Sequence, residues 1–229
     1  MASLKTYEAP SGDLPEDERV YLKQFGQETT RYIMSELKFI NNLEEEWLCE
    51  LFFKYYDDTG ILVGVADSLG FEKPGIIQSM YIFKPPHIGG EVVCHQDSTY
   101  IYTEPESCVG FWFALQDATL ENGCMRFIPG AHKAPLRKRN YRDESGRIVN
   151  EILDDTPFDL ADAVPAEAPA GTLVVFDGRA PHYSGPNLSD RSRHAYTLHV
   201  IDQACHYPAS NWLQRSADLP LRGFEHQPA

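Results

Sequence analysis

The sequence lacks the marks of several common protein classes. No apolar run approaches the roughly 18 residues that a membrane-spanning helix needs. Residues 1–10 have neither the basic start nor the apolar centre of a secretory signal. The five cysteines are an odd number without a Cys-x-x-Cys pair, which argues for reduced thiols inside the cell. We therefore expect no membrane partner and a cytoplasmic location.

Positive charge is also scarce. Lysine and arginine number 20 against 34 aspartates and glutamates, so the formal net charge is −14. A chain this acidic is a poor partner for nucleic acid. Its content of 42% hydrophobic and 24% charged residues excludes disorder over most of the length. With 229 residues the chain is long for one typical domain and short for two, and we predict a single domain over residues 1–229.

The first third of the chain, residues 13–70, is predicted to be helical. Apolar residues recur at helical spacings over residues 13–37. A clearer helix begins at Asn42, which is a good N-cap, and carries one apolar stripe. Residues 61–69 are predicted to form a further short helix, closed by Gly70.

The remainder, with a core over residues 74–220, is predicted to be rich in strands. Runs of β-branched and aromatic residues alternate with turn signals such as Pro-Gly, Asn-Gly and Asp-Gly. The expected strands are residues 76–83, 108–116, 125–128, 171–176 and 193–202. Many short strands with this punctuation favour a β-sandwich or barrel, with a jelly roll as one option. The helices are expected to pack on one outer face of the sheet.

One candidate for chemistry is the His95-Gln96-Asp97 sequence. If it lies in a strand, His95 and Asp97 point the same way and can hold one ion between them. Taken alone, the pattern fits a surface turn equally well.

Two further candidates lie near the end of the chain. His182 follows an apolar strand and stands beside a turn, where a histidine can also simply bond a backbone carbonyl. Arg193 comes eleven residues later and begins a strand in which Arg193, Ala195 and Thr197 share a face. The arginine is either the partner of an interior anion or an exposed charge at a strand end.

Taken together, these residues match the 2-His-1-carboxylate triad of non-haem Fe(II) oxygenases, followed by an arginine for a 2-oxo acid. Three protein ligands on one face leave two positions for the 2-oxo acid and one for O₂. The planar guanidinium of Arg193 suits the distal carboxylate because it can make two charge-assisted bonds. The set therefore predicts Fe(II) as cofactor, with 2-oxoglutarate and O₂ as cosubstrates.

The chain also resembles the phytanoyl-CoA dioxygenase family of Fe(II)/2-oxoglutarate oxygenases. The matching stretches cover about two-thirds of the chain and are residues 78–84, 89–92, 95–97, 102–105, 117–124, 127–132, 187–197 and 211–214. The resemblance implies a mainly β fold with N-terminal helices, built as a double-stranded β-helix (a cupin-like jelly roll).

The resemblance also implies roles for individual residues. It implies iron ligands at His95, Asp97 and His182. It implies cosubstrate contacts from Met80, Trp112, Ser184 and Arg193. Apolar walls from Met80 and Trp112 would suit the methylene groups of 2-oxoglutarate, and the Ser184 hydroxyl could share the distal carboxylate with Arg193. Without the resemblance, core packing is the better interpretation of Met80 and Trp112.

The sequence departs from the family pattern at the front. Family members usually have a longer segment before His-x-Asp than the 94 residues here, including a lysine that helps hold 2-oxoglutarate. An ungapped comparison puts Asn41 at that place, with Lys38 nearby. We therefore expect an altered cosubstrate site.

Other polar residues receive weaker assignments. A local basic run is either an anchor for an anionic group, such as the phosphates of a coenzyme A thioester, or a solvated loop. It consists of Lys133, Arg137, Lys138, Arg139 and Arg142. Four other residues that resemble metal ligands are expected to have no metal role: Cys94, which we assign to packing, and His194, His199 and His206.

The sequence thus predicts an Fe(II)/2-oxoglutarate-dependent dioxygenase that hydroxylates a small-molecule or acyl substrate. The alternative from another class is a catalytically weak or inactive member acting as a binding or regulatory protein, which the short front end favours. A zinc-dependent isomerase or hydrolase on a β-sandwich is a second alternative, but it has no use for Arg193 at this spacing.

Overall fold

The computed structural model describes residues 61–217, 220–221 and 223. The helices expected before residue 60, together with Lys38 and Asn41, lie outside the described residues. The first described element is helix α4 (Ile61–Ser68), which confirms the short helix expected there. The helix ends at Ser68 and is followed by Gly70, whose positive φ of 78° suits a residue without a Cβ atom. No helix in the described part is long and apolar enough to cross a membrane.

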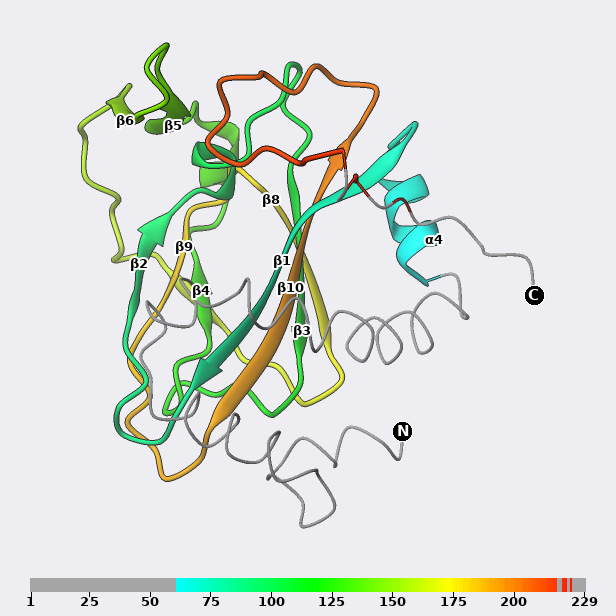
Figure 1. Ribbon diagram of the computed structural model, residues 1–229. Coiled ribbons are helices and arrows are strands. Elements are labelled where there is room, and N and C mark those ends of the chain that lie inside the picture. Colours follow the sequence, from blue (N-terminus) through cyan, green and yellow to red (C-terminus); the bar gives the residue numbers. More distant parts are fainter. Residues whose placement is uncertain (1–60, 218–219, 222, 224–229) are drawn as a thin grey trace, which may run out of the picture.

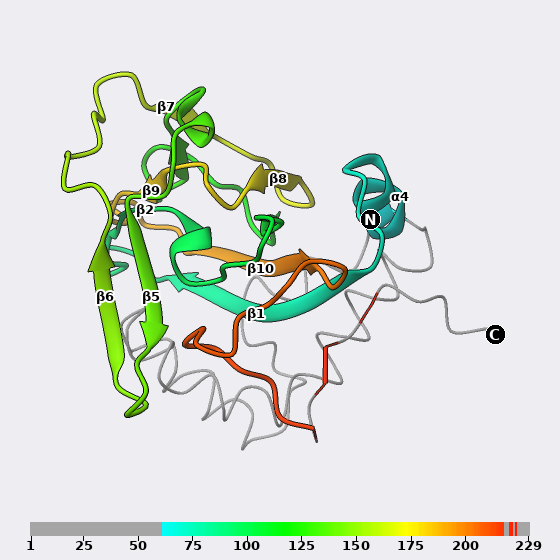
Figure 2. The same cartoon turned by 90° about the horizontal axis from the view of Figure 1, so that it is seen from above.

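Two four-stranded antiparallel sheets make up the body of the protein (Figures 1 and 2). The first sheet has the order β1-β10-β3-β8, with bounds Pro74–Lys84, Arg193–Asp202, Val109–Ala114 and Leu173–Asp177. The second has the order β2-β9-β4-β7, with bounds Val92–His95, His182–Ser184, Met125–Phe127 and Val164–Ala166. The chain alternates between the two sheets from β1 to β4 and again from β7 to β10, so the expected jelly roll is confirmed.

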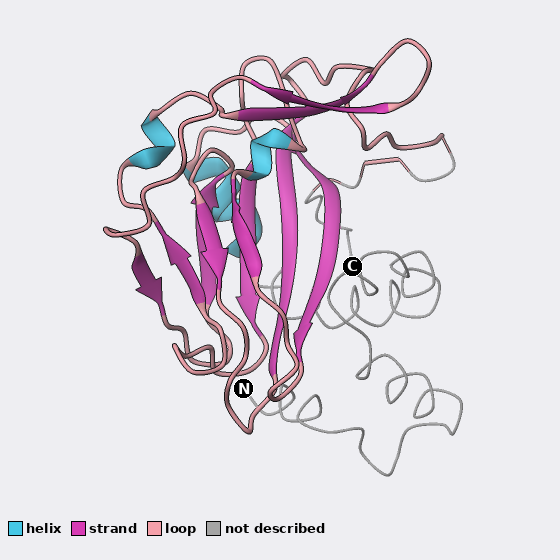
Figure 3. Ribbon diagram, turned by 90° about the vertical axis from the view of Figure 1, so that its left-hand side faces the viewer, coloured by secondary structure: helices cyan, strands magenta, loops and turns pink. Residues whose placement is uncertain are grey.

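A separate hairpin lies at one end of the two sheets (Figure 3). It consists of β5 (Lys138–Arg142) and β6 (Ile148–Ile152), which pair in register. The interpretation of the basic run as a loop is therefore wrong over residues 138–142, where the chain is a strand. Two short 3-10 helices complete the described elements: η3 (Asp97–Thr99) and η4 (Ala131–Lys133).

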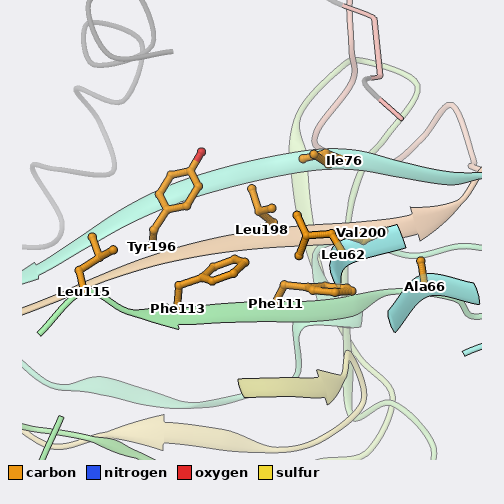
Figure 4. Close-up of a cluster of buried hydrophobic side chains, with 9 residues drawn as sticks. All are labelled: Leu62, Ala66, Ile76, Phe111, Phe113, Leu115, Tyr196, Leu198 and Val200. Atoms are coloured by element: carbon orange, nitrogen blue, oxygen red, sulfur yellow. The ribbon is translucent and has the colours of Figure 1, made fainter. Parts of the chain in front are cut away.

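The outer face of the first sheet is apolar and packs against α4 (Figure 4). The buried residues of this cluster are Leu62, Ala66, Ile76, Phe111, Phe113, Leu115, Tyr196, Leu198 and Val200. Burial of this apolar face holds the sheet and the helix together. The expectation that helices cover an outer face is thus confirmed for α4.

The inner faces of the two sheets enclose a second cluster that contains many small side chains. It consists of Trp112, Ala114, Ala118, Cys124, Met125, Ala168 and Ala195. Because strand residues alternate between faces, Ala195 on β10 carries Arg193, Thr197 and His199 inward with it. The polar candidates of β10 therefore lie between the sheets.

Candidate metal centre

The three predicted metal ligands come together at one place. Their ligating atoms all lie within 4.8 Å of one another, and theirs is the one such group in the described part of the chain. His95 ends β2 and pairs in register with His182, the first residue of β9. Asp97 Oδ1 lies 3.3 Å from His95 Nε2 and 3.7 Å from His182 Nε2.

The local structure around Asp97 differs from the expected one. The strand stops at His95, and Asp97 is the first residue of η3 rather than a strand residue. Strand alternation was thus the wrong reason for placing the two side chains together. The 3-10 turn does it instead, fixed by the bond from Ser98 N–H to the Gly178 carbonyl (2.9 Å).

Gln96, between the two ligands, fastens this turn. Its side chain is only 2% exposed. Its Nε2 donates to the Arg179 carbonyl (2.8 Å), and its Oε1 accepts from Arg137 N–H (3.1 Å). One buried amide therefore ties the His95–Asp97 connection to the segments that lead into β9 and β5.

Backbone carbonyls set the tautomers of the two histidine ligands. His95 Nδ1 lies 2.8 Å from the Val93 carbonyl, and His182 Nδ1 lies 3.0 Å from the Ala180 carbonyl. A carbonyl only accepts, so each Nδ1 must carry the proton and each neutral ring presents a bare Nε2. Two lone pairs then face one carboxylate, which is unfavourable without a cation between them. The donor set fits a divalent metal ion.

The electrostatic environment favours the same state. Burial lowers the pKa of His182 to about 4, so its ring is neutral at pH 7. Burial also pushes the pKa of Asp97 upward, but His199 and His182 outweigh it and hold that pKa well below the usual value. For His95 burial lowers the pKa, and the hydrogen bond and charge of Asp97 raise it overall. The site therefore combines an ionised carboxylate with a neutral imidazole at His182.

The other residues that resemble metal ligands lie outside this group, but one of them, His199, bonds a ligand. Cys94 is half-buried and outside the ligand group, and burial raises the pKa of its thiol. His194 bonds the Tyr81 hydroxyl and contacts the Phe83 ring. His199, however, is buried and its Nε2 lies 3.0 Å from Asp97 Oδ2. It is not among the three ligands but bonds one of them, a contact that the sequence analysis missed.

Arg193 is the most unusual of the residues expected to contact a cosubstrate. Its guanidinium is 1% exposed, and Nη2 donates to the Gly123 carbonyl (2.9 Å). Its Nε and Nη1 have no partner within the described residues. An unpaired buried guanidinium is costly. The alternative of an exposed strand-end charge is therefore wrong, and the arginine has unused donors for an anion.

Of the other three residues of that set, Trp112 and Ser184 are buried and Met80 is half-buried. Met80, Thr197 and Trp112 are register partners on the neighbouring strands β1, β10 and β3. The Trp112 ring lies 5.6 Å from the Arg193 guanidinium carbon. Ser184, on β9, is 3% exposed and is the register partner of Met125 on β4. Trp112 is thus next to Arg193, and Met80 lies in the same sheet, at the same register level as Trp112.

Lys84 is a second buried cation that the sequence analysis missed. It is fully buried and is the register partner of Arg193 on β1. Its ammonium donates to the carbonyls of Gly90 (2.5 Å) and Gly185 (2.6 Å). Burial and the charge of Arg193 lower its pKa to about 7. A lysine at the end of a strand gave no signal in the sequence, because such positions are usually exposed.

The basic run makes mainly internal contacts. Arg137 stacks on Phe158 at 4.1 Å, and Arg139 stacks on Tyr102 at 4.0 Å. Arg142 Nε donates to a backbone carbonyl (3.0 Å). These arginines hold the β5–β6 hairpin in place. Their use as an anchor for an anionic group stays a prediction.

Comparison with known proteins decides the family. The family model described as phytanoyl-CoA dioxygenase (PhyH) matches residues 30–195. This chain belongs to the phytanoyl-CoA dioxygenase family. The expectation from the sequence motifs is therefore confirmed.

Two curated relatives of this phytanoyl-CoA dioxygenase family member show how much of the protein is shared. It is 49% identical over 165 residues to phytanoyl-CoA dioxygenase 1 of Oryza sativa subsp. japonica, which covers 71% of this chain and 58% of the relative. It is 46% identical to phytanoyl-CoA dioxygenase domain-containing protein 1 of Bos taurus, with 69% and 55% covered. The chain thus spans little more than half the length of these relatives.

A solved structure supports the same fold. The non-heme monooxygenase ThoJ in its apo form matches with a TM-score of 0.52 and 28% sequence identity. The match covers 65% of this chain and 54% of ThoJ.

Proposed function

We propose that this protein is an Fe(II)/2-oxoglutarate-dependent dioxygenase that hydroxylates a small-molecule or acyl substrate. The observation that carries the proposal is the pairing of two features: a His-Asp-His group with bare Nε2 atoms, and a buried arginine with unused donors on the adjoining sheet. The first suits a metal, and the second suits a carboxylate. Dioxygenase and monooxygenase names among its relatives support it.

The proposal gives each residue one task. His95 Nε2, Asp97 Oδ1 and His182 Nε2 would hold the iron. Arg193 would bind the distal carboxylate of 2-oxoglutarate, with Ser184 as a second donor. Met80 and Trp112 would flank its methylene groups. When bound, the iron supplies activation of O₂ for substrate oxidation, coupled to decarboxylation of 2-oxoglutarate to succinate and CO₂.

The protein's own contribution is geometry and charge. Buried Gln96 and the 3-10 turn fix the carboxylate against the two imidazoles. The carbonyls of Val93 and Ala180 hold the Nδ1 protons, so each Nε2 is free to bind. The same proposal takes residues 1–229 as one oxygenase domain in the cytoplasm.

The test is release of succinate by purified protein supplied with Fe²⁺ and 2-oxoglutarate. Turnover should depend on all three ligands, so His95→Ala, Asp97→Ala and His182→Ala should each abolish it and weaken metal binding severely. His206→Ala, at an exposed histidine outside the site, is the matched control and should behave like the parent. Equal metal binding by the parent and all three variants would place the metal site elsewhere.

A catalytically weak binding protein is the second candidate, and the same assay separates it from the dioxygenase. It predicts binding of Fe²⁺ and 2-oxoglutarate without succinate release against any candidate substrate. A zinc enzyme predicts zinc after purification without added metal and no effect of Arg193 substitution on its activity.

A further inference from the structure

The two carboxylate oxygens of Asp97 have different neighbours. Oδ1 faces the two imidazoles, at 3.3 Å from His95 Nε2 and 3.7 Å from His182 Nε2. Oδ2 points the other way and lies 3.0 Å from His199 Nε2. Asp97 is 5% exposed and His199 is 3% exposed. Both partners of this bond are therefore shielded from water, where a charge-assisted bond is strong.

The direction of the bond follows from its chemistry. An ionised carboxylate only accepts, so His199 Nε2 must carry a proton and donate it to Oδ2. The Nδ1 atom of the ring is buried and has no partner among the described residues. At this buried position an unprotonated Nδ1 costs less than an Nδ1–H donor that has no acceptor. The ring thus offers Asp97 one donor.

His199 is held more firmly than the side chain it bonds. It lies within β10, between β1 and β3, and its register partners are Gln78 and Gly110. Asp97 belongs to a three-residue 3-10 helix beside the other sheet. The bond therefore joins the first sheet to the 3-10 turn that carries Asp97, and the position of His199 in the sheet fixes the direction of Oδ2.

We propose that His199 is a positioning residue that keeps Asp97 a one-oxygen metal ligand. This inference rests on the proposed function. A carboxylate can bind a metal through one oxygen or through both. With both, the protein would supply four donor atoms and leave two of six positions, too few for bidentate 2-oxoglutarate and O₂ together. By occupying Oδ2, His199 keeps three positions open.

The proposal predicts a split between two affinities. His199→Leu frees Oδ2 to bind the metal, so Mn²⁺ (a redox-stable substitute for Fe²⁺) should bind within about 3-fold of the parent affinity. The affinity of the Mn²⁺-loaded protein for 2-oxoglutarate should fall by about 10-fold or more, equivalent to about 1.4 kcal/mol, because Oδ2 would then take a position that bidentate binding of 2-oxoglutarate needs. Both affinities are measured by calorimetric titration without turnover.

Two variants make the test specific. His199→Gln places an amide N–H about as far out as Nε2 and should restore most of the 2-oxoglutarate affinity. The amide of His199→Asn ends near the level of Nδ1 and cannot reach Oδ2, so this variant should lose 2-oxoglutarate affinity while keeping Mn²⁺ affinity. It replaces His199→Leu in the test if the Leu variant fails to fold. His194→Gln is the matched control, since that histidine lies on the same strand with its ring bonded to Tyr81, away from the metal ligands.

The outcomes separate this inference from the proposed function. If the parent protein binds neither Mn²⁺ nor 2-oxoglutarate, the proposed function fails. If the parent binds both, and His199→Leu and His199→Asn either match it or lose both affinities to the same degree, His199 has no positioning role. A large loss of 2-oxoglutarate affinity with Mn²⁺ affinity retained, rescued by Gln, is the expected result.

Discussion

At the scale of single residues, buried positive charge determines which ligands the site can bind, because it favours an anion. Arg193 and Lys84 lie opposite each other on β10 and β1, and neither has an ion-pair partner in the described part of the chain. Two adjacent buried cations repel each other and are poorly solvated. An anion that enters beside them relieves both costs, and a dicarboxylate suits the forked guanidinium.

The first prediction compares two arginines near each other in sequence. Arg193→Ala should raise the Michaelis constant for 2-oxoglutarate by about two decades, because a charge-assisted forked contact is lost. Metal affinity should change little. Arg191→Ala should be much milder, since Arg191 is exposed and contributes its carbonyl to the turn. Normal kinetics for Arg193→Ala would remove the basis for a 2-oxo acid at this position.

The second prediction concerns the pH dependence of stability that Lys84 creates. Its pKa is 10.5 in the unfolded chain and about 7 in the folded protein. Between these values the unfolded chain binds more protons, so the free energy of unfolding should rise with pH, by up to about 1.4 kcal/mol per pH unit. Below pH 7 the folded protein bears the full cost of the buried ammonium.

Denaturant unfolding from pH 6.5 to 9 checks this slope. Lys84→Met loses two hydrogen bonds and should be less stable, but its profile should lack the rise that Lys84 gives the parent. Lys138→Met, at an exposed position on β5, should keep the parent profile. Parallel profiles for the parent and Lys84→Met would show that Lys84 does not titrate in this range.

At the scale of elements, the sequence predicted those with strong local patterns. The five expected strands correspond to β1, β3, β4, β8 and β10, where β-branched and aromatic residues dominate. It missed β2, β5, β6, β7 and β9, which are three to five residues long and are paired through the tertiary fold rather than by local propensity. Strands as short as β2 and β7 span too few residues to show a periodic signal.

The site was predictable in part for the same reason. Ligand spacing and the resemblance gave His95, Asp97 and His182, although Asp97 lies in a 3-10 turn and not in a strand. His199 was within reach of the sequence, because it alternates in phase with Arg193 on β10. Lys84 was not, since only pairing of β1 with β10 brings it beside Arg193.

The third prediction tests how an element supports the metal ligands. Gly110 on β3 faces Phe176 on β8, and a Cβ atom at Gly110 would overlap the Phe176 ring. That ring packs edge-on against His182, with centroids 4.7 Å apart and an angle of 60° between the ring planes. Gly110→Ala should therefore displace a ring that supports His182, destabilise the protein by about 1–3 kcal/mol and weaken metal binding.

The same substitution in helix α4 is the control. Gly64 is exposed, and nothing lies within 4 Å of a Cβ atom built there. Gly64→Ala should stabilise the protein by about 0.5–1 kcal/mol, because alanine favours a helix interior, and should leave metal binding unchanged. Thermal unfolding and Mn²⁺ titration measure both effects. Equal effects at the two glycines would refute the crowding argument.

At the scale of the whole molecule, the site joins the two sheets of the jelly roll. The metal ligands belong to β2, η3 and β9 on one side. His199 and Arg193 belong to β10 in the other sheet. The bond from His199 to Asp97 crosses between them. The spacing of the sheets, set by the small residues of the inner cluster, therefore determines the geometry of the site.

The last prediction follows from this position. A ligand that binds only the folded state stabilises it by RT ln(1 + [L]/Kd), about 2.7 kcal/mol at a hundredfold excess over Kd. Mn²⁺ should therefore raise the melting temperature, and 2-oxoglutarate should raise it further only when Mn²⁺ is present, since the two would share the site. A chelator should reverse both shifts. Asp97→Ala should melt at the same temperature with and without Mn²⁺, because the loss of Oδ1 removes the anionic ligand. Stabilisation by 2-oxoglutarate that survives in Asp97→Ala and in the presence of chelator would mean that the cosubstrate binds away from this metal centre.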